Sequence, residues 1–469
     1  MSAVDAIIKT SYFATAVLFI AGLRSMSSPA TARRGIVWAG VGMSVAAAAT
    51  LFTPGMHHRP LMVGAVVVGV AIAQWTGQRV PMTGMPQMIA LFNGMGGGAA
   101  AAIAAVELIK GGAAVAARRP ADVAILAVVG ALIGAVSFGG SLIAFGKLQG
   151  LVKRVLSFPG QNVADLLVLA VAVAAGVLVI LGETGAVTHL GTPLVAAFIA
   201  IAFVFGILMT LPIGGADMPV VISLYNALTG LAVAFEGYVL GNPAMIIAGM
   251  VVGAAGTMLT QLMARAMNRS LSNVLFSGFG DARSGGGPAA VAGASRPIDA
   301  DDAAIMMAYA DKLVIVPGYG MAVAQAQHKV WELAQLLIDR GVQVKFAIHP
   351  VAGRMPGHMN VLLAEAGVPY DFIYDIDDIN PEFATTDVAL VIGANDTVNL
   401  AARTDPASPI YGMPILDVGR ARNVVVIKRG AGAGFAGVEN SLFFADNVRM
   451  LYRDGQAAAA ELIRGIKSL

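Results

Sequence analysis

The segment Val314-Ile315-Val316-Pro317-Gly318-Tyr319-Gly320 joins a short apolar run to a turn with two glycines. A helical pattern follows, so the local order is strand, glycine turn and helix. This order is typical of a dinucleotide-binding turn, because glycines let the backbone approach a pyrophosphate and a helix N-terminus favours negative charge. The third glycine of the usual fingerprint is Val323 here, so a purely structural turn is the alternative.

From residue 312 onward, apolar runs of strand length alternate with helical patterns. We predict strands at 312–317, 343–348, 371–374, 388–393, 414–418 and 423–428. We predict helices at 320–340, 359–366 and 446–468. Such alternation indicates a Rossmann-like α/β domain with a doubly wound parallel sheet, for which about 170 residues suffice.

The charges expected at the strand ends favour a phosphorylated dinucleotide. NAD-binding units commonly place an acid at the end of the second strand. Here that strand ends in Ile348-His349-Pro350, and Arg354 follows. Basic groups suit a 2′-phosphate, so NADP(H) is favoured over NAD(H). Lys428 and Arg429 end a later strand as a second basic pair, for which an ordinary solvated strand end is the alternative.

Two further loops are expected at the same edge of the sheet. The glycine-rich loop 430–437 has the composition of a flap over a ligand. The segment 393–399 follows the fourth strand, where ligand contacts are expected. Its Asp396 is either a site residue or the cap of the next helix. This half shows no general acid/base or nucleophile cluster, and hydride transfer needs none because the cofactor carries the chemistry.

The first 280 residues have a different composition. They hold 14 Lys/Arg and 7 Asp/Glu, whereas the remaining 189 hold 16 and 21, which gives net charges of +7 and −5. The whole chain is 57% hydrophobic and 12% charged, against roughly 25% charged in soluble domains. There is no cysteine, which excludes disulfides, thiolate catalysis and cysteine-ligated metals, and we predict no metal site.

Nine apolar runs are long enough to cross a bilayer, which takes about 20 residues. They lie at 6–23, 35–54, 61–76, 85–109, 122–146, 164–182, 192–212, 218–238 and 243–266. Their many small residues favour a tight α-helical membrane bundle. The first run lacks a positive segment and a cleavage site, so we expect it to be retained. Nine loop Lys/Arg against five predict an outside N-terminus and a cytoplasmic C-terminal domain.

Two of these runs resemble each other. Each begins with Met-Pro, at Met85 and at Met218, and reaches an asparagine seven residues after the proline, at Asn93 and at Asn226. Each asparagine would lie about 10 Å inside the membrane from the cytoplasmic end. The pair is either a duplicated helix that lines a polar path or a coincidence in an apolar chain.

Polar side chains within the apolar runs are costly and are often functional. The candidates are Asn93, Ser141, Asp217, Ser223, Asn226, Thr257 and Gln261. Their alternative role is hydrogen bonding between helices. The middle of each run lacks His, Asp and Glu. A proton relay would therefore need water or a titrating group from a partner.

We predict three parts: a membrane domain at 1–275, a linker at 276–300 and an NADP(H)-binding domain at 301–469. The linker is rich in Gly, Ala and Pro, a composition that gives flexibility. A membrane bundle joined to a dinucleotide site suggests that redox chemistry is coupled to transport.

Over nearly its whole length the chain resembles the beta subunit of the proton-translocating NAD(P) transhydrogenases. The most specific stretches include Gly318-Tyr319-Gly320-Met321-Ala322, His349-Pro350-Val351-Ala352-Gly353-Arg354, Gly393-Ala394-Asn395-Asp396-Thr397 and Gly215-Ala216-Asp217-Met218-Pro219. The resemblance implies an NADP(H) domain that holds its nucleotide in a flipped orientation. It implies these contacts: Gly318, Tyr319, Gly320, Met321, Ala322, Val323, His349, Val351, Ala352, Gly353, Arg354, Gly393, Ala394, Asn395, Asp396, Thr397, Lys428, Arg429, Gly434, Phe435, Ala436 and Gly437.

The resemblance also assigns roles. Lys428 and Arg429 would hold the 2′-phosphate, and Asp396 would couple nucleotide state to protonation. Asn93, Asp217 and Asn226 would lie along the proton path. Family members usually have Tyr where this chain has Phe435, and some carry His at the Asn93 position, whereas others take the titrating His from a partner. The lack of a titrating group in mid-membrane fits the second type.

The resemblance further implies alpha-type partner subunits that carry the NAD(H) domain and additional membrane helices, in a dimer of protomers. The expected location is the bacterial inner membrane, in contact with lipid and not with nucleic acid. The expected activity is hydride transfer from NADH to NADP⁺ driven by inward proton movement. One alternative is a channel or transporter gated by a cytoplasmic nucleotide sensor. Another is a soluble reductase tethered by its helices, for which nine spans are too many.

Overall fold

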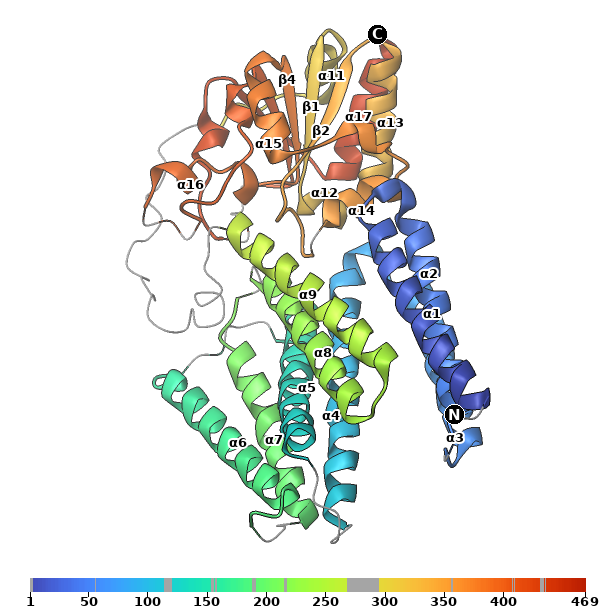
Figure 1. Ribbon diagram of the computed structural model, residues 1–469. Helices are drawn as coiled ribbons and strands as arrows, with labels where there is room; N and C mark the ends of the chain where they lie inside the picture. Colours follow the sequence, from blue (N-terminus) through green and yellow to red (C-terminus); the bar gives the residue numbers. More distant parts are fainter. Residues whose placement is uncertain are drawn as a thin grey trace. The chain divides into compact units, whose positions relative to one another are not determined.

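Figure 1 shows the computed structural model of the chain. The structure describes residues 3–469 except 55, 114–119, 153–155, 157, 188–190, 215–216, 268–294, 356, 407, 409, 431–433 and 435. It divides into two compact units. One comprises the residues up to Ile213 together with Val221–Thr260, and the other comprises Gly214–Val220 with Gln261–Leu469. Most of the predicted linker, 276–294, lies outside the described residues.

The first unit is built from long apolar helices, which confirms the membrane-bundle prediction. Nine helices in the described part of the chain are long and apolar enough to cross a membrane. They are α1 (Ala3–Met26), α2 (Pro29–Leu51), α3 (Arg59–Arg79), α4 (Met85–Ala113), α5 (Ala121–Leu148), α6 (Gln161–Glu183), α7 (Gly191–Thr210), α8 (Met218–Val239) and α9 (Pro243–Ala266). The chain is therefore a multi-pass membrane protein.

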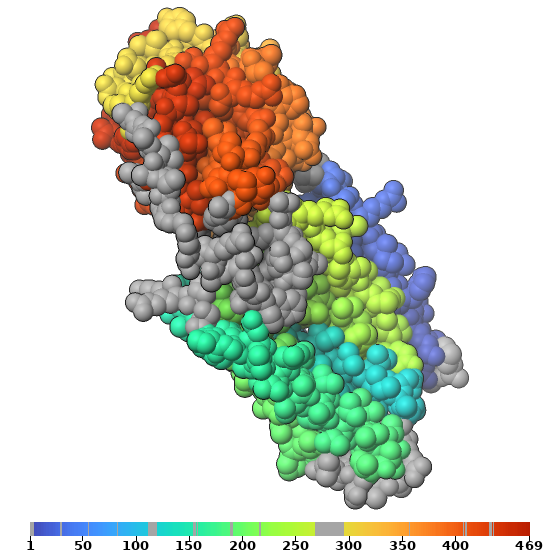
Figure 2. Space-filling model, turned by 90° about the vertical axis from the view of Figure 1, so that its left-hand side faces the viewer, coloured from blue at the N-terminus to red at the C-terminus, as the bar shows by residue number. Residues whose placement is uncertain are grey.

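Glycines set the spacing of the helices in this unit. A Cβ added to Gly97 of α4 would lie 2.9 Å from the carbonyl oxygen of Gly134 in α5. A Cβ added to Gly230 of α8 would lie 2.6 Å from the amide nitrogen of Gly253 in α9. Backbones this close exclude any larger residue, as expected for membrane helices that associate by close packing. Helices α6 and α7 also pack together, and Figure 2 shows them side by side on one face.

The second unit contains a six-stranded parallel sheet in the order β3-β2-β1-β4-β5-β6. The strands are β1 (Lys312–Pro317), β2 (Gln343–Ile348), β3 (Ile373–Asp375), β4 (Val388–Ile392), β5 (Asn423–Lys428) and β6 (Val448–Tyr452). The chain moves outward from β1 to one edge, returns, and then extends to the other edge. This order is that of the Rossmann fold, so the predicted doubly wound sheet is confirmed.

Helices and short turns cover both faces of this sheet (Figure 1). Helices α11 (Ala300–Ala308), α13 (Gln327–Asp339) and α17 (Gly455–Ser468) pack together against it. A core of buried apolar side chains lies on the opposite face, under α15 (Ile376–Ile379) and several 3-10 turns. The remaining helices are α12 (Tyr319–Val323), α14 (His358–Glu365) and α16 (Ala401–Thr404).

Three predicted elements of this unit are wrong in detail. Residues 414–418 do not form a strand; they run as extended chain into a 3-10 turn, and the amide of Leu416 bonds to the carbonyl of Thr397. The true last strand is β6, at the start of the helix predicted over 446–468. The helix predicted over 320–340 is interrupted at Gln325, whose left-handed φ of 50° separates α12 from α13.

Candidate functional site

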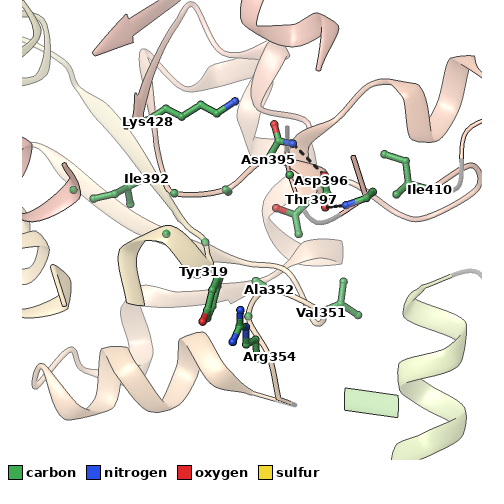
Figure 3. Close-up of a pocket in the computed structure, with 18 of the residues that line it drawn as sticks. Tyr319, Val351, Ala352, Arg354, Ile392, Asn395, Asp396, Thr397, Ile410 and Lys428 are labelled. Atoms are coloured by element: carbon green, nitrogen blue, oxygen red, sulfur yellow. Dashed lines mark hydrogen bonds between the residues drawn. The ribbon is translucent and has the colours of Figure 1, made fainter. Parts of the chain in front are cut away.

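A cleft lies where β1, β4 and β5 end, at the carboxyl edge of the sheet. This edge is where doubly wound sheets bind ligands. The residues of the sheet domain that line it include Gly318, Tyr319, Gly320, Val351, Ala352, Gly353, Arg354, Gly393, Ala394, Asn395, Asp396, Thr397, Lys428, Arg429, Gly434, Ala436, Arg453 and Gly455. Figure 3 shows Tyr319 and Arg354 side by side, with Asn395, Asp396 and Thr397 grouped on another loop.

The glycines of the first turn allow two loops to cross. The amide of Gly318 bonds to the carbonyl of Ile392 at 2.9 Å, and the amide of Gly320 bonds to the carbonyl of Gly393 at 2.9 Å. A Cβ on Gly320 would lie 2.6 Å from the Cα of Gly393, which itself has a φ of +66°. The helix that begins there, α12, has only five residues. The glycines are therefore needed for the close contact between these two loops, and they would also let a ligand approach the backbone.

The loop after β2 is held by two buried histidines. Nδ1 of His349 accepts the amide of Val351 at 3.2 Å, and its Nε2 donates to the carbonyl of Pro414 at 2.6 Å. Nδ1 of His358 accepts the amide of Arg354 at 3.1 Å. Burial lowers the pKa of His349, and burial together with the nearby Arg354 lowers the pKa of His358 to about 4. Both rings are therefore neutral at pH 7 and can accept these bonds.

Arg354 projects from this loop over an aromatic ring. Its guanidinium carbon lies 4.4 Å from the centroid of the Tyr319 ring, a cation–π distance. Burial raises the pKa of Tyr319, and the Arg354 charge opposes this shift. Gly353 has a φ of +111°, and a Cβ there would lie 2.5 Å from Nδ1 of His358. The loop therefore presents a fixed cation and a phenol ring to the cleft.

Asp396 joins the loop after β4 to the glycine-rich loop after β5. Its Oδ2 accepts the amide of Ala436 at 3.0 Å, and its Oδ1 accepts Nδ2 of Asn395 at 3.1 Å. A Cβ at Gly434 would collide with both side chains. Helix α16 begins only at Ala401, so these bonds do not cap that helix.

Two cations lie at the end of β5, on the other side of the cleft. Burial lowers the pKa of Lys428 below its ordinary value, and the nearby Asp396 carboxylate opposes this shift only in part. The ammonium of Lys428 lies 4.7 Å from the centroid of the Phe443 ring. Arg429 is exposed and lines the same cleft. This side of the cleft is therefore suited to an anionic group.

Several predicted contacts lie away from the cleft wall. Met321 and Ala322 are buried in the core, at 0% and 1% exposure, and Val323 is 40% exposed. His349 supports the loop from beneath, with 2% exposure. Gly437 has a φ of +68° and turns the glycine-rich loop. Phe435 lies outside the described residues.

Sequence reasoning missed two residues at the end of β6. Arg453 and Gly455 line the cleft beside Lys428 and Arg429. The helix predicted over 446–468 covers β6 and therefore hides this strand end. The cap signal of Asp454 followed by Gly455, which opens α17, was the available indication that a strand ended there.

In the membrane unit the matched asparagines have different environments. Nδ2 of Asn93 donates to the hydroxyl of Ser141 at 3.0 Å, between α4 and α5. Asn226 is exposed on α8. Asp217, which belongs to the second unit, immediately precedes α8 and is buried, with 6% exposure. Both helices do begin at the matched methionines, Met85 and Met218, so the shared start of the pair is confirmed.

The other polar candidates of the membrane unit tie helices together or bond within a helix. The hydroxyl of Thr260 donates to Ser223 at 3.1 Å, and that of Thr257 donates to the carbonyl of Gly253 at 2.7 Å within α9. Gln261 is exposed. Sequence reasoning missed Ser137, whose hydroxyl lies 2.6 Å from that of Thr229 and donates to the carbonyl of Tyr225 at 3.0 Å.

Lys147 has a defined structural task in this unit. Its ammonium donates to the carbonyls of Thr210, Leu211 and Ile213 at 2.9, 2.5 and 2.6 Å. These carbonyls belong to the last residue of α7 and to the turn that follows it, where a cation complements the helix dipole. Lys147 therefore fixes the start of the connection from α7 to α8. The described residues hold no cluster of three or more His, Cys, Asp or Glu suited to a metal.

Comparison with known proteins identifies the family. The family model for the NAD(P) transhydrogenase beta subunit matches residues 8–465. The NAD(P) transhydrogenase subunit beta of Rhodospirillum rubrum is 46% identical over 465 residues, which cover 97% of this chain and 98% of that protein. A sequence from a defined strain of the same species matches with the same identity and coverage. The chain therefore belongs to the NAD(P) transhydrogenase beta subunit family.

Proposed function

We propose that this chain binds NADP(H) in the cleft at the carboxyl edge of its sheet. Hydride would pass from NADH, held by an alpha-type partner subunit, to NADP⁺ held here, as in the Si–Re-specific transhydrogenases. Inward proton movement through the helices would drive the transfer. The assembly would be a dimer of such protomers in the bacterial inner membrane, with the sheet domain in the cytoplasm.

The charges at the cleft are the observation that carries the NADP(H) proposal. Lys428 ends β5, Arg429 follows it, and Arg354 lies on the loop after β2. The acid that NAD-binding units place at the end of the second strand is replaced by His349, which is neutral and occupied by backbone bonds. A 2′-phosphate carries a charge of roughly −1.5 to −2 at pH 7, by analogy with other phosphomonoesters, and such a group favours this cation-rich setting.

The residues of the chain would position the nucleotide and leave the chemistry to it. The nicotinamide ring supplies the hydride acceptor when NADP⁺ is bound. Val351 and Ala352 give the cleft an apolar wall, and Arg354 stacked on Tyr319 gives it a fixed cation. The backbone crossing at Gly320 and Gly393 lets a pyrophosphate come close to the main chain.

Asp396 is suited to link protonation with nucleotide release. As a carboxylate it accepts one bond from the glycine-rich loop at Ala436 and one from Asn395. A proton placed on Oδ2 would turn that oxygen from an acceptor into a donor, and the bond to Ala436 would be lost. Protonation of Asp396 would therefore loosen the loop and favour exchange of the nucleotide.

The membrane unit would deliver the proton. We propose that Asn93, Asn226 and Asp217 lie along its path, together with a titrating group from a partner subunit. Amides can order water but do not hold a proton at neutral pH. The segment 276–300, most of which lies outside the described residues, has a Gly, Ala and Pro content typical of linkers, and it would let the NADP(H) domain move between an exchange state and a hydride-transfer state.

Coupled turnover in vesicles tests this proposal. The chain and its partner subunits would be reconstituted, and NADH-to-NADP⁺ transfer would be followed with and without an imposed pH gradient. We expect the gradient to speed the transfer. A rate that ignores the gradient, or nucleotide-dependent flux of another ion without hydride transfer, would reject the proposal, and the second result would favour the gated channel.

Two leucine variants test the proposed path. Asn93→Leu and Asn226→Leu should reduce coupled proton movement more than NADPH binding, because neither residue belongs to the nucleotide cleft. Proton uptake into the vesicles and nucleotide fluorescence give the two quantities. Equal loss of both would reject the path assignment.

A further inference from the structure

Arg453 occupies a position beside the basic pair that ends β5. It is the first residue after β6, and in the parallel register Lys428 pairs with Tyr452. The amide of Arg453 bonds to the carbonyl of Lys428 at 3.1 Å, so the two backbones are directly joined. Arg453 also lines the same cleft as Lys428 and Arg429. Three cations therefore project from two adjacent strand ends.

The present partner of Arg453 leaves its guanidinium available. Its Nε lies 3.4 Å from Oε2 of Glu461, and its side chain is 59% exposed. Exposed ion pairs of this kind contribute little to stability. The side chain of the neighbouring Asp454 has another partner, because it accepts the amide of Gln456 at 3.1 Å as the cap of α17. A ligand anion can therefore compete with Glu461 for Arg453.

The same corner of the cleft favours an anion for a second reason. Gly455, the first residue of the 14-residue helix α17, also lines the cleft. The N-terminus of a helix carries a partial positive charge and free amide groups. Neighbouring strands lie about 4.8 Å apart, so the ends of β5 and β6 can reach one phosphate group.

We propose that Arg453 is a third cation for the 2′-phosphate of NADP(H), alongside Lys428 and Arg429. This inference rests on the proposed NADP(H) function of the cleft. A guanidinium can donate two parallel bonds to phosphate oxygens, which an ammonium cannot. Arg453 would thus add to the preference for NADP(H) over NAD(H) without touching the hydride-transfer centre.

Binding of NADPH and of NADH to the full-length chain in detergent tests the proposal. The variants are Arg453→Gln and Arg453→Lys, and nucleotide fluorescence gives Kd for each ligand. We expect Arg453→Gln to weaken NADPH binding about 10-fold, the lower end for a charge-assisted bond at an exposed site, and to change NADH binding less than about threefold. Arg453→Lys should fall between the wild type and Arg453→Gln, because it keeps the charge and loses the bidentate geometry.

Controls separate ligand binding from local structure and net charge. Arg464→Gln removes an equal charge from an exposed position of α17 that does not line the cleft, and it should leave both affinities unchanged. Glu461→Gln removes the competing carboxylate, so NADPH affinity should stay the same or rise. Thermal unfolding of each ligand-free variant shows whether the fold persists.

The outcomes separate the role of Arg453 from the proposed NADP(H) function of the cleft. Loss of NADPH affinity in Arg429→Gln but not in Arg453→Gln overturns the role of Arg453 alone. Equal weakening of NADPH and NADH in Arg453→Gln overturns it as well, because the 2′-phosphate is then not involved. A wild-type chain without preference for NADPH overturns the proposed function itself.

Discussion

Replacing Asp396 tests whether its carboxylate holds the glycine-rich loop over the nucleotide. Asp396→Asn keeps the shape of the side chain and one acceptor oxygen, whereas Asp396→Ala removes both acceptors. The difference between the two variants therefore measures the one acceptor bond that the Asn oxygen retains, which is the bond to Ala436, 3.0 Å long in the structure, when that oxygen faces the glycine-rich loop. Any effect of the lost negative charge on a polyanionic ligand is common to both variants and cancels in the comparison.

The magnitude follows from that one bond. Loss of a partly buried hydrogen bond costs about 0.5–1.5 kcal/mol, and an unsatisfied amide adds to this cost. A net cost of about 1.4 kcal/mol corresponds to a factor of about 10. We therefore expect the dissociation rate constant of NADPH to be about 10-fold higher in Asp396→Ala than in Asp396→Asn.

Stopped-flow fluorescence with excess NADP⁺ as a competitor measures this rate constant in the full-length chain. A ratio within twofold of one would show that the bond from Asp396 does not retain the nucleotide. The ligand-free unfolding temperature of each variant serves as the control. A large fall in that temperature for Asp396→Ala alone would assign the bond to folding and contradict the loop role.

Three further predictions concern stability and pH. The pKa of His358 is lowered from 6.5 to about 4, so between these pH values the unfolded chain binds more protons than the folded chain. The free energy of unfolding therefore falls as the pH drops through that window. His358→Gln should make the decrease in unfolding temperature from pH 7 to 5 smaller, whereas His328→Gln, at an exposed position, should not. Gly320→Ala should lower the unfolding temperature by about 2–10 °C, because the added Cβ overpacks against Gly393, and it should also weaken NADPH binding. An unchanged unfolding temperature would contradict the close contact between the loops at Gly320 and Gly393. Tyr225→Phe and Thr210→Val should each cost about 0.6–1.7 kcal/mol, and their combination should cost less than the sum of the two, because both remove the same 2.6 Å hydroxyl contact, although Thr210 also bonds to the carbonyl of Gly206. Full additivity in detergent unfolding would show that the contact contributes nothing.

The strands that the sequence predicted correctly share one property. Strands β1, β2 and β5 begin and end at the predicted residues, because each is an apolar run bounded by polar or turn-forming residues. The run at 414–418 has the same composition and is largely buried, but its backbone bonds go to loops. Hydrophobicity indicates burial, whereas pairing with a neighbouring strand depends on tertiary structure. Strand β6 was not predicted because it is not a continuous apolar run. Its Arg449 and Tyr452 give it the pattern of an amphipathic helix.

For the candidate site, the sequence predicted the positions of the loops but not the contacts of their side chains. Sequence order placed the loops after β1, β2, β4 and β5 at one edge, because parallel strands all end there. It could not show which side chains of a loop turn inward, and Met321 and Ala322 became core residues. It also could not show that the carboxylate of Asp396 reaches Ala436, 40 residues away in the chain. Such contacts depend on how the loops cross, which side-chain chemistry alone does not specify.

The orientation of Asn226 follows from its neighbour on α8. Tyr225 is fully buried, its hydroxyl lies 2.6 Å from that of Thr210 on α7, and its carbonyl accepts Ser137 of α5. Gly140 of α5 leaves the space that the Tyr225 ring fills, since a Cβ there would collide with it. These contacts set the rotation of α8 about its own axis. Successive residues of a helix are about 100° apart, so a rotation that buries Tyr225 leaves the next residue on a different face.

Asn226 is therefore exposed, while Asn93 pairs with Ser141 inside the bundle. An amide exposed at membrane depth is costly unless water or another helix satisfies it. The two asparagines of the matched pair do not meet within the described part of this chain. If both belong to the proposed proton path, water or a helix from a partner subunit would have to satisfy the amide of Asn226. For the proposed path, the rotation fixed by Tyr225 therefore favours a contribution from outside this chain at Asn226.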